Sequence, residues 1–403
     1  MAKITPEKAL KYAKILTYVN FTVPLKNPTR FKMIRLYFLR ILVSAHVFIA
    51  EAPLVYTILT DDFSDPIKTT KVFSVAIACI QAPWQLGFLS LHYDRLQMSI
   101  FNFNCCSYRT ITVYFIYFNR NIELNFRDFV ISEMEHYFKC AEKYEREVYQ
   151  FYVDKCRIFY ICSVVSVFCT IVGLGFGPIV TRDPIPVDAK YPFNVTQEPM
   201  RTVIHVHQSV CLYQCFSSVC HSFLFGILIW FTTARFEIVS NQLRNANSLY
   251  DIIAGIREHI KLLRYAEEII TAIRTSILIV IIIVTFSIVT GGLVIVSNAA
   301  LVDKAQFVIL CIAGLFEVYA YAWPADYLMD ASTSVADAIY ESEWFNQEHA
   351  FKTNVLYILF RSQTPLTIQV SSMIPVLSLN YFSSYTSTAF SYLMTLRVIF
   401  IED

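Results

Sequence analysis

The sequence predicts an all-α membrane protein with seven transmembrane helices, and three observations carry this prediction. Of the 403 residues, 56% are hydrophobic and only 16% are charged, whereas soluble proteins average about 25% charged residues. Seven stretches carry almost no charge, and each is long enough to cross a hydrocarbon layer that needs about 20 residues at helical rise. Because a spanning segment must satisfy its backbone polar groups internally, these stretches are expected to be helices. They are 36–59, 72–92, 158–180, 203–231, 275–302, 306–325 and 374–400.

Lysine and arginine residues indicate how the chain is oriented in the membrane. The segments that alternate with the predicted spans carry 25 Lys and Arg residues on one side and six on the other. Leaving out the long 94–157 segment still gives 16 against six. Positive residues collect on the cytoplasmic side, so the amino-terminal arm 1–35 is predicted to be inside. With seven spans, the carboxyl terminus is then outside, which is opposite to a receptor coupled to G proteins.

The segments predicted to lie outside support this orientation. Asn194-Val195-Thr196 is a glycosylation acceptor in one of them, whereas the similar Asn20-Phe21-Thr22 lies in the amino-terminal arm, where no glycan is expected. None of the 11 cysteines falls in the outside segments, so free thiols are expected, because disulfides form in oxidising compartments.

The segments predicted to lie inside contain amphipathic helices at 128–150 and 234–272, where apolar residues recur at helical spacing between charges. They either lie on the inner leaflet or extend the spans into a shared inner domain. The apolar stripes continue in phase from the spans, which favours the second interpretation. We therefore divide the chain into an arm (1–35), helices one to six with a ligand pocket and inner extensions (36–325), a cytoplasmic anchor segment (326–373) and the last helix (374–403).

The last predicted helix is unusually rich in hydroxyl side chains for an uncharged span. Ser384, Ser387, Ser391 and Thr395 recur at steps of three or four and therefore share one face. Beyond Thr395 the same face becomes apolar at Val398 and Ile399. Residue types alone leave two interpretations open. The face either packs closely against a neighbouring helix or lines a wet ion path that closes at an apolar constriction.

Several motifs near the carboxyl end resemble those of the insect odorant receptors. They are 334–340 (SVADAIY), 344–345 (WF), 361–366 (RSQTPL), 378–382 (SLNYF) and 391–392 (SY), together with 184–186 (PIP) and 191–193 (YPF) in an outside segment. The stretch 367–371 (TIQVS) departs from the Thr-Ala-Gly run of many members, which affects only the entry to the last helix. The related gustatory receptors usually carry Gln-Phe after the last-helix tyrosine, whereas Tyr392 is followed by Leu393-Met394.

This resemblance implies an odorant-gated cation channel in the plasma membrane of sensory dendrites that needs no G protein. Family members assemble as tetramers with an olfactory co-receptor, which has a longer second inner loop, so this chain resembles the ligand-tuned subunit. The alternative is a gustatory-type channel that forms a homotetramer. Matched by its Ser-Tyr pair, the last helix lines the pore, and the family's gate falls on Thr395, Val398 and Ile399.

The resemblance also implies a pocket for a small volatile ligand in the outer half, among predicted helices two, three, four and six. Such pockets are mostly apolar with a few polar anchors. Lipid contact and ordinary packing remain alternatives for each side chain. The residues expected at the pocket are Val72, Phe73, Ala76, Cys79, Thr170, Gly173, Phe176, His207, Gln208, Cys211, Tyr213, Gln214, Phe307, Leu310, Cys311 and Gly314.

Other classes of site are not expected. His207, Cys211 and Cys215 share one helix face, but three ligands on one straight helix rarely converge on one ion, so neither a metal nor a cofactor is predicted. No acidic, histidine or cysteine groups converge as an enzyme would need, and a net charge near zero argues against nucleic acid. Glu51 and Glu317 are costly in lipid and are therefore functional candidates. Glu317 is expected to face protein or water.

Overall fold

A computed structural model describes residues 4–17, 30–60, 66–91, 134–181, 187, 189–195, 197–370 and 374–401. Within these ranges the regular structure is helical, and the one β interaction is an isolated bridge between Val370 and Ile374. The predicted all-α class is therefore confirmed for the described part of the chain. The helices are α1 (Pro6–Leu16), α2 (Arg30–Thr60), α3 (Pro66–Leu91), α6 (Lys143–Thr181), α7 (Met200–Arg244), α8 (Leu249–Val296), α9 (Leu301–Tyr340), the 3-10 helix η2 (Trp344–Asn346), α10 (His349–Ser362) and α11 (Leu379–Ile401).

Five of these helices contain stretches long and apolar enough to cross a membrane. The stretches lie in α2, α6, α7, α8 and α9, and α3 carries a shorter apolar run over Val72–Gln81. The hydroxyl-rich α11 is not among the five. These helices indicate a multi-pass membrane protein. The total of seven spans and the orientation in the membrane stay predictions.

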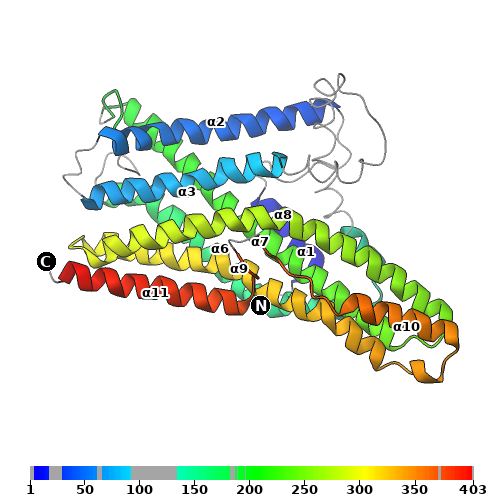
Figure 1. The fold of residues 1–403 in the computed structure, drawn as a ribbon. Helices are drawn as coiled ribbons and strands as arrows, with labels where there is room; N and C mark the ends of the chain where they lie inside the picture. Colours follow the sequence, from blue (N-terminus) through cyan, green and yellow to red (C-terminus); the bar gives the residue numbers. More distant parts are fainter. Residues whose placement is uncertain are drawn as a thin grey trace, which may run out of the picture.

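The helices form a bundle around α7, which is buried along most of its length and contacts α1, α2, α3, α6, α8 and α9. Figure 1 shows that the ends predicted to be outside lie together at the left of the bundle. They are the end of α2, the start of α3, the end of α6, the start of α7, the α8–α9 connection and the last turn of α11. Successive described helices of the bundle therefore run in alternating directions.

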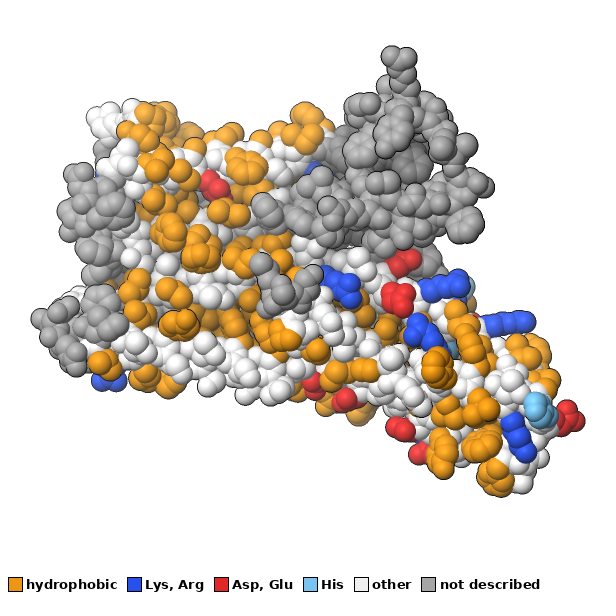
Figure 2. Space-filling model, viewed as in Figure 1, with side chains coloured by type: hydrophobic (Ala, Val, Ile, Leu, Met, Phe, Trp, Pro, Cys, Tyr) orange, Lys and Arg blue, Asp and Glu red, His pale blue; other side chains and the backbone are white. Residues whose placement is uncertain are grey.

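Beyond the bundle, the amino-terminal part of α8 and the carboxyl-terminal parts of α7 and α9 continue toward α10 (Figure 1). Apolar residues of these parts, including Phe236, Val239, Ile252 and Ile339, join the same core cluster as the spans, together with Phe351 of α10. Figure 2 shows orange hydrophobic side chains over the left part of this face, whereas blue and red charged side chains gather to the right, over the region of α10. The inner sequences are therefore helical extensions of the spans that share one core.

Element boundaries differ from the prediction where local signals interrupt a helix. The stretch predicted as one helix over 234–272 breaks after Arg244, and α8 begins after Ser248, whose hydroxyl accepts from the backbone N–H of Asp251 in a capping box. The last helix begins at Leu379 instead of 374, because the preceding residues form the Val370–Ile374 bridge. The division expected at 325/326 falls inside the continuous helix α9.

Candidate functional site

The segment that precedes α7 is fixed by hydrogen bonds against the outer parts of α2 and α7. The side chain of Gln208 accepts from the backbone N–H of Val187 at 2.9 Å and donates to Val187 O and to Tyr191 Oη, both at 3.1 Å. From the other side, the backbone N–H of Lys190 donates to Thr57 Oγ1 of α2 at 2.7 Å. We call residues 187 and 189–191 the outer segment, after the side of the membrane on which they are predicted to lie. It bridges the two helices across their outer parts.

Apolar side chains of α3 lie beneath the outer segment. Val72 and Ala76 are buried and form a cluster with Leu54 of α2 and Ala189 of the outer segment. One turn further along α3, Cys79 is buried in a neighbouring cluster with Val47, Ala50 and Cys211. Val72, Ala76 and Cys79 therefore face the interior, as a pocket would require, whereas Phe73 between them is exposed.

A layer of sulfur and imidazole groups follows between α2, α3 and α7. Cys79 of α3 has its sulfur 3.8 Å from the sulfurs of both Cys211 and Cys215 of α7. Beside them, the rings of His46 and His207 lie 4.4 Å apart, and His46 Nδ1 is 2.9 Å from Gln214 Oε1. The layer thus contains four of the residues predicted at the pocket: Cys79, His207, Cys211 and Gln214.

The predicted pocket residues on α6 and α9, and Tyr213 of α7, lie elsewhere. Gly173, Phe176 and Tyr213 are exposed, and Thr170 Oγ1 donates to Ser166 O of its own helix. On α9, Phe307, Cys311 and Gly314 lie against α8, where Gly291 and Val284 are their neighbours, and the nearby Leu310 is half-buried. These residues do not join the layer between α2, α3 and α7. Their part in ligand binding stays a prediction.

A second polar group in the bundle centres on Glu317 of α9, which is buried as expected against protein. Its Oε1 accepts from Gln81 Nε2 of α3 at 2.7 Å and from Ser222 Oγ of α7 at 2.6 Å. These contacts tie three helices together inside the apolar core. Sequence reasoning singled out Glu317 and missed Gln81 and Ser222, although an amide within an apolar run is itself a signal of a buried contact. It likewise missed His46.

The helix α11 packs by one face and leaves its hydroxyl face open. Tyr385 Oη is 3.0 Å from Thr285 Oγ1 of α8, and the Phe382 ring contacts Tyr319 of α9. Ser384, Ser387, Ser391, Thr395 and Val398 are exposed. The hydroxyls of Ser391 and Thr395 bond back to the carbonyl oxygens of residues 387 and 391, each at 3.0 Å. The backbone of Ile399 is helical, but its side chain lies outside the described residues.

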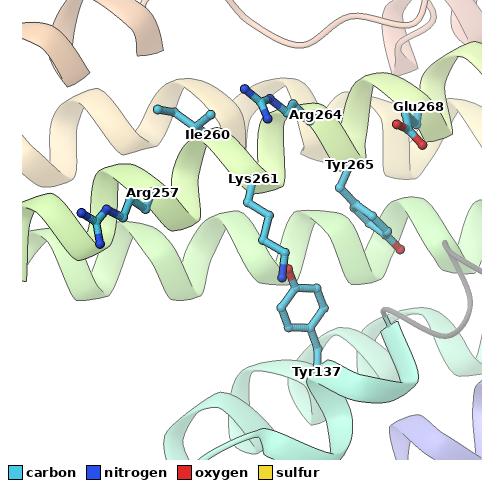
Figure 3. Close-up of a pocket in the computed structure, with 7 residues that line it drawn as sticks. All are labelled: Tyr137, Arg257, Ile260, Lys261, Arg264, Tyr265 and Glu268. Carbon is cyan, nitrogen blue, oxygen red and sulfur yellow. The ribbon is translucent and has the colours of Figure 1, made fainter. Parts of the chain in front are cut away.

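The inner extensions carry a basic groove of about 330 Å³, shown in Figure 3. Arg257, Lys261 and Arg264 project from α8, and the Lys261 ammonium lies 5.1 Å from the centre of the Tyr137 ring. Nearby, Arg235 of α7 forms ion pairs with Glu145 at 3.1 Å and Glu258 at 3.4 Å. This region is charged and lies apart from the outer layer of histidine and cysteine.

Comparisons with known proteins agree with the motifs found in the sequence. The model of the family described as 7tm Odorant receptor matches residues 112–390. Odorant receptor 10 of Aedes albopictus is 27% identical over an alignment of 220 residues, and the match covers 51% of this chain and 57% of that relative. Odorant receptor 22c of Drosophila melanogaster is 31% identical over 103 residues, 26% of this chain and 25% of the relative. This chain thus spans just over half the length of the first relative.

The fold also has a solved counterpart. The insect olfactory receptor OR5 of Machilis hrabei, in complex with eugenol, superposes with a TM-score of 0.75 over 98% of each chain. The two sequences are 14% identical, so the likeness concerns the fold. A second structure of the same receptor superposes with a TM-score of 0.73 over 97% of each chain.

Proposed function

The chain belongs to the 7tm Odorant receptor family, and from that premise we propose that it is the ligand-tuned subunit of an odorant-gated cation channel. The subunit resides in the plasma membrane of sensory dendrites, with its amino terminus inside, and it assembles with an olfactory co-receptor into a hetero-tetramer. Its ligand is a small volatile molecule, and no G protein takes part. The observation that carries the proposal is the family match over residues 112–390.

The volatile ligand binds between α2, α3 and α7, beneath the outer segment. Buried apolar side chains there, Val72 and Ala76 among them, offer a low-polarity wall. Gln208, Gln214 and His207 supply a few polar groups, and binding sites for small molecules typically combine an apolar lining with few polar anchors. The α9 residues Phe307 and Cys311 act behind this layer through their contacts with α8.

The pore runs along the hydroxyl face of α11. In an apolar bundle, a helix would be expected to turn its hydroxyls toward protein, whereas Ser384, Ser387, Ser391 and Thr395 are all exposed. A face of this kind suits a water-filled path shared with partner subunits. Val398 and Ile399 provide the apolar constriction that closes the path by dewetting. Ligand binding shifts the packing of α8 and α9 against α11, and this movement opens the constriction.

Whole-cell recording tests the proposal. The chain is expressed with and without an olfactory co-receptor, and both sets of cells are exposed to a panel of volatile compounds while cation current is measured. We expect at least one compound to evoke current only in the co-expressing cells. The current should persist when a non-hydrolysable GDP analogue fills the pipette, because no G protein links ligand to channel.

The controls separate the competing functions. Equal currents without the co-receptor would favour a gustatory-type homotetramer. Currents abolished by the GDP analogue would favour a G-protein pathway. A chain that reaches the cell surface with the co-receptor and responds to no volatile compound, while a known receptor responds in the same cells, would contradict the proposal.

A further inference from the structure

We propose that Cys79, Cys211 and Cys215 form a binding site for a thiophilic metal ion, either zinc or Cu(I), between α3 and α7. The three sulfurs all lie within 4.8 Å of one another, and the two pairs that include Cys79 are 3.8 Å apart. They come from two helices. The objection that ligands on a single helix cannot converge on one ion therefore no longer applies.

The spacing of the sulfurs fits metal ligation. Zinc–sulfur bonds are about 2.3 Å long, so two sulfurs on a tetrahedral ion stand about 3.8 Å apart. Three sulfurs around a trigonal Cu(I) ion lie at a similar separation, and soft thiolate ligands select these two ions. By contrast, a disulfide would need a sulfur–sulfur distance of about 2.05 Å. All three cysteines are free thiols in the structure.

The surroundings of the sulfurs also suit an ion. Val47, Ala50 and Val75 pack against the cysteines and shield them from water. One helical turn before Cys211, both ring nitrogens of His207 are buried and have no hydrogen-bond partner. A turn of this ring toward the sulfurs would complete a Cys3His set, which is one of the common structural zinc sites. Each thiol that ligates the ion releases its proton to water.

An ion at this place would link the two helices that carry most of the proposed odorant contacts. Cys79 lies one turn beyond Ala76 on α3, and Cys211 lies one turn beyond His207 on α7. The ion would hold α3 and α7 at a set distance beneath the outer segment. This consequence for odorant binding rests on the proposed function, whereas metal binding itself does not.

Metal retention by the purified receptor tests the site. The full chain, co-purified with its co-receptor in detergent, is washed with chelator under a phosphine reductant. It is then loaded with Zn²⁺ or, separately, with Cu(I), and desalted. We expect about one ion per chain by mass spectrometry, measured relative to co-receptor prepared alone. Loading with Co²⁺ should give the charge-transfer absorption of cobalt–thiolate bonds, which identifies sulfur as the ligand.

Variants locate the ion. The triple variant C79S/C211S/C215S should retain none of the additional ion. Each single cysteine variant should bind the ion at least about 10- to 100-fold more weakly, because the loss of an outer-shell contact alone weakens metal binding by that factor. H207A should weaken binding while the cobalt–thiolate absorption remains. Cys220→Ser and His205→Ala, on the same helix α7 but outside the cluster, serve as matched controls and should bind as the unmodified chain does.

The outcomes separate this site from the channel function. The proposal is overturned if the chain retains no ion, if the triple variant binds as well as the unmodified chain, or if peptide mapping finds Cys79 joined to Cys211 or Cys215 by a disulfide. Retention of an ion by a chain that never responds to volatile compounds would leave the metal site intact and contradict the proposed function alone. Odorant-evoked current from a chain that retains no metal would support the proposed function and contradict the metal site alone.

Discussion

Glu317 illustrates how a carboxyl group is accommodated within an apolar helix bundle. A polar side chain buried without partners is costly, and Glu317 avoids this cost because Gln81 and Ser222 both donate to its Oε1. The three residues come from α9, α3 and α7, so the group also determines how these helices sit against one another. Close by, Tyr321 Oη lies 3.3 Å from Ser276 Oγ of α8. The main structural role of Glu317 is therefore to hold α9 against α3 and α7.

Two replacements of Glu317 should show whether stability depends on its hydrogen-bond acceptor or on its charge. Glu317→Gln keeps an oxygen acceptor for both donors and should change thermal stability little. Glu317→Leu leaves the Gln81 amide and the Ser222 hydroxyl without their acceptor, at a cost of about 1–3 kcal/mol per buried group. The leucine variant should therefore melt at a lower temperature in detergent, followed by thiol-reactive dye. Glu341→Gln at an exposed ion pair is the control. A leucine variant as stable as the unmodified chain would refute this role.

The sequence predicts single residues of the site well only where a polar or charged side chain stands in an otherwise apolar stretch. Glu317 stands out because a charge in an apolar stretch needs a partner, and Cys79 and Gln208 were included by their position on the expected helices. Which side chains meet depends on how each helix is rotated, and one apolar face looks much like another in a bundle. For this reason the pocket candidates include Phe73 and Tyr213, which are exposed, and leave out His46, which lies beside His207.

At the scale of elements, the outer segment depends on a single side chain for much of its attachment to α7. Gln208 makes three of its hydrogen bonds, and the Thr57–Lys190 bond supplies one more from α2. In a protein, each such bond contributes roughly 0.5–1.5 kcal/mol. Loss of Gln208 should therefore release one side of the segment while the bond to α2 remains.

We expect Gln208→Leu to lower odorant potency about tenfold or more, because the segment no longer covers the layer beneath it. The half-maximal odorant concentration is measured in cells that co-express the co-receptor, at equal surface density. Gln242→Leu makes the same change at an exposed position near the other end of α7 and should leave potency unchanged. Potency that is unaffected by Gln208→Leu would mean that the outer segment takes no part in binding.

The open face of α11 leads to a prediction about the closed pore. Val398 is 57% exposed in this chain, one turn beyond Thr395 on the same face. If it forms the apolar constriction, Val398→Ala should widen the gap and raise the basal current about twofold or more without odorant. Val308→Ala, an exposed valine of α9, is the matched control. Basal current and ion selectivity that do not change in Val398→Ala would place the gate elsewhere.

Helix positions were predicted more reliably than helix ends. Apolar length alone located α2, α6, α7, α8 and α9, because a bilayer demands a minimum run of apolar residues. The ends depend on short polar signals. Asn245 to Ser248 carries such a signal, since a serine three residues before an acidic residue can cap a helix, and it marks the start of α8. The Val370–Ile374 bridge precedes α11, which begins at Leu379, and no comparable pattern in the sequence predicts this bridge.

Charged side chains are distributed unevenly over the face of the molecule that Figure 2 shows. In Figure 2 the charged side chains gather over the inner extensions, and Figure 1 places the turn between α8 and α9 at the opposite end. The excess of lysine and arginine in alternate segments predicts that the end with the inner extensions faces the cytoplasm, and this orientation stays a prediction. Because the end with the turn between α8 and α9 also holds Asn194 on an exposed part of the chain before α7, orientation can be tested chemically.

Asn194 should carry a glycan only if the end of the molecule that contains α8–α9 and the start of α7 faces the lumen and then the exterior. We expect a peptide N-glycosidase to shift the gel mobility of the unmodified chain by one glycan, and Asn194→Gln to remove that shift. Asn20→Gln should leave it in place, because the amino-terminal arm is predicted to be inside, where the acceptor meets no transferase. An epitope tag at the amino terminus should accordingly resist protease added to intact cells. A shift that is lost in Asn20→Gln and kept in Asn194→Gln would show that the topology is the reverse of the predicted one. The proposed constriction at Val398 would then lie at the cytoplasmic end of α11.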